Sequence, residues 1–198
     1  MGLSIHYSGR IADKSKLPRL IEELEEIAVI QGWDYHVFER EFPPRDYSEH
    51  EHDGNLYGIF FSHPRCEPVS IAFLSNGRMS GPLQLTCWGE SQDETEQRHL
   101  YLISTKTQYA GVEIHKMVIS IFRYLHKRYL TDFELIDEGE YWETNDEELL
   151  KRNFKKNTDL INSVASALEN NRRNEGEDTE AFIERVIQQM HDKNSDIS

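Results

Sequence analysis

Apolar and polar residues alternate at the start of the chain. Residues 3–8 follow this pattern, which is typical of a half-buried β-strand. Residues 17–28 place apolar side chains three and four positions apart, which predicts a helix that ends at Gly32. Residues 33–37 alternate again and predict a second strand. A strand, a helix and a strand in close succession indicate a right-handed crossover between parallel strands, although a return to a different sheet edge fits as well.

The middle of the chain has the pattern of an antiparallel meander. Four short segments with short connections predict strands, at residues 56–62, 69–74, 83–88 and 99–104. The pair Asn76-Gly77 is the strongest turn signal in the chain, because both residues tolerate a positive φ angle. We therefore expect neighbouring strands here to run in opposite directions.

The most pronounced helical pattern covers residues 112–130, where apolar side chains form one broad stripe. Thr107 is expected to cap this helix, and His115 and His126 are expected to flank its stripe. A short strand is predicted next, followed by three helical segments, at residues 133–136, 147–156, 160–169 and 179–189.

These elements predict an α+β protein. We expect a mixed, largely antiparallel sheet of about six or seven strands, with two main helices packed on it. Residues 1–156 are predicted to form this single α+β domain, and residues 157–198 a helical C-terminal extension. The last helix has enough apolar surface to need a partner, either the domain itself or a second copy; these residues are Phe182, Val186, Ile187 and Met190.

The net charge of the chain limits the classes of partner that it is expected to bind. The 198 residues include 36 Asp and Glu against 22 Lys and Arg, a formal net charge of −14. Nucleic acids and anionic membranes repel such a chain, so binding to either is not expected. No stretch approaches the ~20 apolar residues of a membrane span, and no signal peptide is recognisable. We expect a cytoplasmic protein in which Cys66 and Cys87 are reduced, with a disulfide between them as the alternative.

One candidate for metal binding lies in the loop expected at residues 39–55. His50 and His52 stand two positions apart and would project to the same side of an extended backbone. Such a pair can chelate a divalent metal when a third ligand comes from elsewhere in the fold. The competing interpretation is a solvated polar loop, so no cofactor is expected to be required, although a divalent metal is possible.

A candidate for acid-base chemistry depends on the first two strands being parallel neighbours. In that arrangement His6, Asp34 and His36 would share the sheet face opposite the first helix. Two imidazoles and a carboxylate in proximity could transfer protons or bind a metal, as in a small hydrolase. The alternative is a solvated sheet face on which these side chains have no catalytic role.

The third candidate is an acidic segment with two aromatic residues. Residues 132–148 contain nine Asp and Glu and no Lys or Arg. Tyr141 and Trp142 lie among these acids, next to Glu138, Glu140 and Glu143. Aromatic residues bracketed by acids predict a recognition surface for a basic protein partner. Alternatively, basic residues of the preceding helix neutralise the segment within the fold; these are Lys116, Arg123, Lys127 and Arg128.

Two classes of function follow from these candidates. The first is a non-catalytic interaction or regulatory protein that binds a partner through the acidic segment, or a second copy through its C-terminal helices. The second is a small metal-dependent or acid-base hydrolase built on the His and Asp candidates. Convergence of several histidines in one cleft would favour the enzyme, and their dispersal would favour the interaction protein.

Overall fold

The computed structural model describes residues 2–174 and 176–195, without the side chains of Glu94 and residues 190–195. It confirms the α+β class, with 47% of residues in helices and 21% in strands. The chain divides into two compact units within α6 (Glu147–Asn170), and the larger unit is Leu3–Phe154. The expected contribution of Met190 to an apolar surface lies outside the described side chains.

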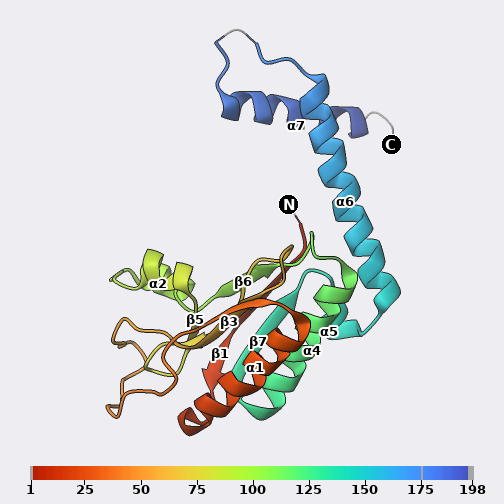
Figure 1. The fold of residues 1–198 in the computed structure, drawn as a ribbon. Helices are drawn as coiled ribbons and strands as arrows, with labels where there is room; N and C mark the ends of the chain where they lie inside the picture. Colours follow the sequence, from red (N-terminus) through yellow and green to blue (C-terminus); the bar gives the residue numbers. More distant parts are fainter. Residues whose placement is uncertain (1, 175, 196–198) are drawn as a thin grey trace. The chain divides into compact units, whose positions relative to one another are not determined.

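The strands of the described residues form two antiparallel sheets (Figure 1). One has the order β6-β1-β7 and the other the order β2-β3-β4-β5. The bounds of the strands are β1 Ser4–Ile11, β2 Asp34–Val37, β3 Tyr57–Ser62, β4 Val69–Phe73, β5 Met79–Ser80, β6 Ile103–Lys106 and β7 Leu130–Asp137. The Asn76-Gly77 turn between β4 and β5 is confirmed, with Gly77 at a φ of 82°.

The predicted parallel pairing of the first two strands is wrong. β1 pairs with β6 and β7, whereas β2 pairs only with β3, in the other sheet. The crossover signal is local in sequence, but the partners of β1 come from beyond residue 100, and no local pattern identifies them.

The two sheets meet through β1. Arg10 forms an isolated antiparallel bridge with Arg78, and the Ile11 backbone N–H donates to Gly77 O at 3.0 Å. Tyr7 makes a second connection, because its hydroxyl donates to Ser70 O at 3.2 Å and accepts from Ser70 N at 2.9 Å. The phenol is buried, and this burial raises its pKa above the ordinary value.

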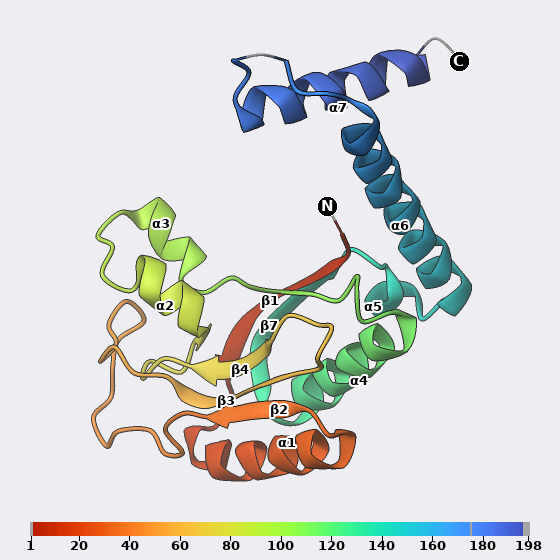
Figure 2. The same ribbon diagram turned by 45° about the horizontal axis from the view of Figure 1, so that its top comes forward.

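Two principal helices pack on the sheets, as predicted. They are α1 (Leu17–Gln31), which follows a short 3₁₀ turn, η1 (Lys14–Lys16), and α4 (Val112–Arg128). Figure 2 shows α1 running along β2 and α4 beside β7. Glu23 joins the two helices, since its carboxylate accepts from the hydroxyls of Tyr124 and Tyr129 at 2.6 and 2.7 Å. One core cluster unites both helices with both sheets and includes Tyr7, Leu24, Phe61 and Phe122.

The strand predicted at residues 83–88 is a helix, α2 (Pro82–Trp88). Pro82 takes the first helical position, where its missing N–H leaves no hydrogen bond unmade. Leu85 and Trp88, three residues apart, pack on a small apolar cluster, whereas Leu83 is 65% exposed. The helical spacing therefore decides which side chains are buried. A second short helix, α3 (Glu94–His99), follows in the segment after α2.

The described part of the smaller unit comprises Gly2 and the residues from Lys155 onward, with most of α6 and all of α7 (Thr179–Ser195). Val186 is fully buried, and Arg185 forms an ion pair with Glu177 at 2.8 Å. Among the described residues, no helix combines the length and the apolar character that a membrane crossing requires.

A short helix, α5 (Tyr141–Thr144), precedes α6 in the larger unit.

Candidate functional site

The outer surface of the three-stranded sheet carries alternating acidic and apolar residues of β7. Glu134 lies opposite Ser8 of β1, and Ile136 lies opposite His6. Glu138 continues the row, because its backbone N–H donates to Ser4 O at 3.1 Å. Ile136 is 67% exposed, and both glutamates are exposed as well. We call the row of Glu134, Ile136 and Glu138 the acidic face.

The carboxylate of Glu138 is held in place by β1. It accepts from the Ser4 backbone N–H at 2.7 Å and lies 3.3 Å from Nε2 of His6. His6 and Glu138 were predicted for two different sites, and the structure brings them together. These two contacts hold the carboxylate of Glu138 toward β1.

Buried Asp137 organises the turn that follows the acidic face. Its carboxylate accepts from the backbone N–H groups of Gly139 at 2.7 Å, Tyr141 at 2.8 Å and Trp142 at 3.0 Å. Glu140, inside this turn, has a φ of 61°. A non-glycine residue in the left-handed region is unfavourable, so the bonds to Asp137 must outweigh that cost.

His115 of α4 contacts Asp137 through one ring nitrogen and Thr107 through the other. Its Nε2 lies 3.0 Å from Oδ1 of Asp137, and its Nδ1 lies 2.7 Å from the Thr107 hydroxyl oxygen. Because the carboxylate only accepts, Nε2 of His115 donates to Asp137, and Nδ1 lies within hydrogen-bond distance of the Thr107 hydroxyl. Burial acts to raise the pKa of Asp137, but the bonds from His115 and from backbone N–H groups outweigh it and leave the pKa below its ordinary value.

Thr107, His115 and Asp137 have the order of a hydroxyl, an imidazole and a carboxylate found in hydrolytic triads. Their exposed fractions are 0%, 0% and 4%, so the hydroxyl does not face a cleft. The predicted capping role of Thr107 is replaced by this contact, and the N-cap of α4 is Gly111. The arrangement is suited to hold the acidic turn to α4.

Tyr141 and Trp142 are half-buried and pack against the protein itself. The guanidinium of Arg123 lies 5.3 Å from the Tyr141 ring centre and 5.8 Å from that of Trp142. It also donates to the backbone oxygens of both residues, at 2.9 and 3.1 Å. Trp142 meets the Phe133 ring edge-on at 6.0 Å. The described contacts of both rings are therefore made within the chain. The binding of a partner by Tyr141 and Trp142 stays a prediction.

The C-terminal end of the predicted acidic segment is neutralised within the fold, and Lys116 is the one of the four expected basic residues that forms an ion pair with it among the described residues. Glu147 bonds to Lys116 and Lys151, and the hydrogen bonds from these two lysines lower its pKa to about 2. Lys151 also reaches Glu148 at 2.9 Å. The acids predicted to bind a basic partner are all exposed; they are Glu138, Glu140 and Glu143.

Asp34 and His36 are far from His6 in the topology. They lie on β2, the edge strand of the four-stranded sheet, and His36 packs against Phe38 and Phe60 at ring distances of 4.9 and 5.6 Å. The expectation that His6, Asp34 and His36 share one sheet face is therefore wrong. Its premise was that β1 and β2 pair.

His50 and His52 do not meet a third ligand in the part of the chain that the structure describes, where no group of three or more His, Cys, Asp or Glu is placed to hold a metal. His52 uses both ring nitrogens locally, with Nε2 at 3.1 Å from Gly89 O and Nδ1 accepting from Gly54 N at 3.2 Å. Metal binding by the pair stays a prediction, and it would require His52 to give up these bonds.

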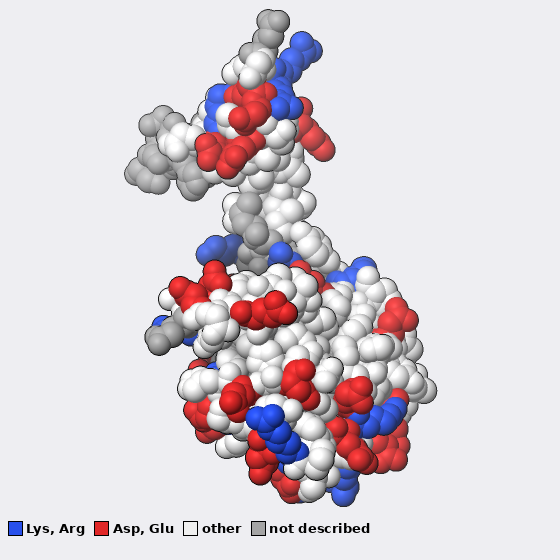
Figure 3. Space-filling model, turned by 90° about the vertical axis from the view of Figure 1, so that its left-hand side faces the viewer, with Lys and Arg blue, Asp and Glu red and all other residues white. Residues whose placement is uncertain are grey.

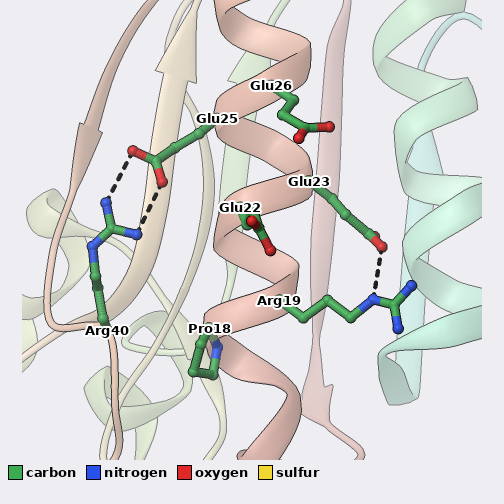
Figure 4. Close-up of a pocket in the computed structure, with 7 residues that line it drawn as sticks. All are labelled: Pro18, Arg19, Glu22, Glu23, Glu25, Glu26 and Arg40. Atoms are coloured by element: carbon green, nitrogen blue, oxygen red, sulfur yellow. Dashed lines mark hydrogen bonds and ion pairs between the residues drawn. The ribbon is translucent and has the colours of Figure 1, made fainter.

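A second acidic surface lies on α1, around an open cavity of about 790 Å³ (Figure 4). Two of its glutamates are paired, Glu25 with Arg40 at 2.9 Å and Glu23 with Arg19 at 3.1 Å. Glu22 and Glu26 form no ion pair in the described residues. On another face, acidic groups are scattered among fewer basic ones (Figure 3). The acid excess is thus spread over several surfaces.

Comparisons with protein-family models, with curated proteins and with solved structures found no match for this chain. The functional argument therefore rests on the geometry of the molecule.

The contact of His115 with Thr107 and Asp137 was not predicted from the sequence. Thr107 and Asp137 lie eight and 22 positions from His115, in the connection between β6 and α4 and in β7. The position of His115 beside the apolar stripe of α4 was the available signal, because a buried imidazole requires hydrogen-bond partners.

Proposed function

We propose that this protein is a non-catalytic interaction module whose acidic face binds a basic protein segment. The observation that carries the proposal is the exposed Ile136 between Glu134 and Glu138. An exposed apolar side chain flanked by acids fits a segment that alternates basic and apolar residues.

Pre-organisation supports the same conclusion. β1 fixes the carboxylate of Glu138, and the pairing of β1 with β7 fixes the backbone of Glu134 and Ile136. A surface already held in its binding conformation loses little conformational entropy when a partner docks. The acidic charge would also steer a basic partner to the surface, and nucleic acid away from it.

The proposal can be tested with a synthetic peptide of alternating Lys and Val residues. We expect Glu134→Lys to raise the dissociation constant about five-fold, because one exposed charge interaction contributes up to about 1 kcal/mol. Glu22→Lys on α1 is the matched control, with the same change of charge at an exposed position. Isothermal titration calorimetry at low salt measures both.

Equal loss of affinity in the two variants would mean that only net charge matters, and it would refute a specific acidic face. A peptide of alternating Glu and Val should not bind. Binding of the Lys peptide should weaken as salt is added, because the interaction is electrostatic and exposed.

We further propose that the C-terminal helices associate with a second copy of the chain. Leu160 of α6 is 43% exposed and Ile183 of α7 is 37% exposed. Sedimentation equilibrium should give twice the chain mass of 23.3 kDa, and a Leu160→Glu, Ile183→Glu double variant should sediment as one chain. Leu83→Glu, at another exposed leucine, should leave the dimer intact. A native chain that sediments with the mass of one chain would contradict the proposed association of the C-terminal helices.

A cytoplasmic location and independence from cofactors are part of the same proposal. Cys66 and Cys87 are free thiols, which suits a reducing compartment. Burial raises the pKa of Cys66 to about 12, so its thiol is protonated and unreactive at neutral pH.

A further inference from the structure

A cavity of about 560 Å³ has a lining that contrasts with the acidic chain around it. Its described lining residues are His50, Arg78, Gln92, Gln97, Arg98 and Tyr101. Among these described residues, two arginines supply the formal charge and no Asp or Glu is present. The whole chain, in comparison, has a formal net charge of −14. A local excess of positive charge of this kind favours an anionic ligand.

The turn between β4 and β5 builds one wall of this cavity. The side-chain amide of Asn76 donates to Glu49 O at 3.1 Å and to the Tyr101 hydroxyl oxygen at 3.2 Å. Its oxygen accepts from the Arg78 backbone N–H at 3.0 Å. Asn76 is itself buried, so three separate segments of the chain are tied together where the cavity forms.

Arg78 lies between a tyrosine ring and a second arginine, with electrostatic compensation from Glu49. Its guanidinium lies over the Tyr101 ring, 3.3 Å from the ring centre, and it is half-buried. Arg10 stands directly opposite it in the bridge between the two sheets. Arg10 is paired with Glu49, whereas Arg78 forms no ion pair in the described part of the chain. Like charges opposed across a bridge are unfavourable, and burial lowers the pKa of Arg78.

We propose that this cavity binds the phosphate group of a phosphorylated small molecule, with Arg78 and Arg98 as its charge partners. The planar guanidinium fork matches the oxygens of a phosphate, and two arginines balance the charge of a phosphate dianion. Gln92, Gln97 and Tyr101 offer hydrogen bonds to the rest of the ligand. The cavity volume lies within the range of roughly 300–1,000 Å³ that small-molecule sites occupy, which favours a small molecule over a protein segment.

The test uses the full chain in a phosphate-free buffer, titrated in a calorimeter with phenyl phosphate and, separately, with inorganic phosphate. We expect saturable one-to-one binding of phenyl phosphate. Arg98→Gln, at an exposed position, should weaken it at least ten-fold, because a charged hydrogen bond is worth about 1.5–3 kcal/mol. Arg65→Gln, also exposed but outside the cavity, should bind as the native chain does.

If inorganic phosphate binds more weakly than phenyl phosphate, the organic part of the ligand also contributes to the affinity. If the two bind equally, the phosphate group alone accounts for the affinity. Either result supports the site. Benzoate tests carboxylates and should bind more weakly than phenyl phosphate. The proposal is overturned if neither phosphate probe saturates by about 10 mM, if Arg98→Gln binds like the native chain, or if benzoate binds as tightly as phenyl phosphate.

Discussion

Replacing Asp137 with Ala is expected to lower the free energy of unfolding by about 3–5 kcal/mol, because it leaves several buried donors without a partner. The carboxylate accepts from three backbone N–H groups and from His115, and it is almost completely buried. Urea unfolding at neutral pH, followed by circular dichroism, measures the loss. A loss below about 1 kcal/mol would show that this network does not hold the turn.

The pH dependence provides a second test of the same group. The folded-state pKa of Asp137 lies below its ordinary value, so its stabilising effect is present above the unfolded pKa and is lost as the pH falls through the folded pKa. The native chain should therefore exceed Asp137→Asn in stability most strongly near neutral pH. The difference should shrink as the pH falls below about 4. A difference that stays constant with pH contradicts the assigned charge.

Replacing Gly58 with Ala is expected to destabilise the fold by about 3–5 kcal/mol, from backbone strain and overpacking together. Gly58 lies in β3 with a φ of 135°, a conformation that L side chains rarely adopt. An added Cβ would also collide with the backbone of β4, at Ile71 O and, at 2.9 Å, at Ala72 Cα. Neither backbone atom can move without disturbing the pairing of β3 and β4.

Gly32→Ala is the matched control for this prediction. Gly32 ends α1 with a φ of 64°, but no atom lies within 4 Å of an added Cβ. The cost there is limited to the left-handed conformation, about 1–2 kcal/mol. Thermal unfolding of both variants separates the two effects. Equal losses would mean that the close approach of β3 to β4 has no energetic consequence.

Local patterns predicted most of the elements but not their partners. The apolar stripes of α1 and α4 and the Asn76-Gly77 turn depend on neighbouring residues, and the structure has all of them. The pairing of β1 with β7 joins residues that are 119 to 132 positions apart, from Ile11 with Leu130 to Ile5 with Asp137, and alternation alone does not encode such a partner. The segment at residues 83–88 was misassigned because two leucines two positions apart imitate a strand, whereas Pro82 begins a helix.

The candidate site was predictable in part. Glu138 was predictable because it belongs to a segment, residues 132–148, that holds nine acids and no Lys or Arg. Ile136 was interpreted as an ordinary strand residue, since its exposure depends on which face of β7 the helix α4 covers. Arg78 and Arg98 gave no signal, because residues from α3 and from separate turns and loops form their cavity only after folding.

Chemical-shift mapping of the Lys and Val peptide on the full chain tests the proposed acidic face most directly. The largest backbone amide changes are expected at Glu134, Ile136 and Glu138, with progressive loss as salt is added. Changes centred instead on Glu22 and Glu26 of α1, or changes that persist unaltered at high salt, would contradict it.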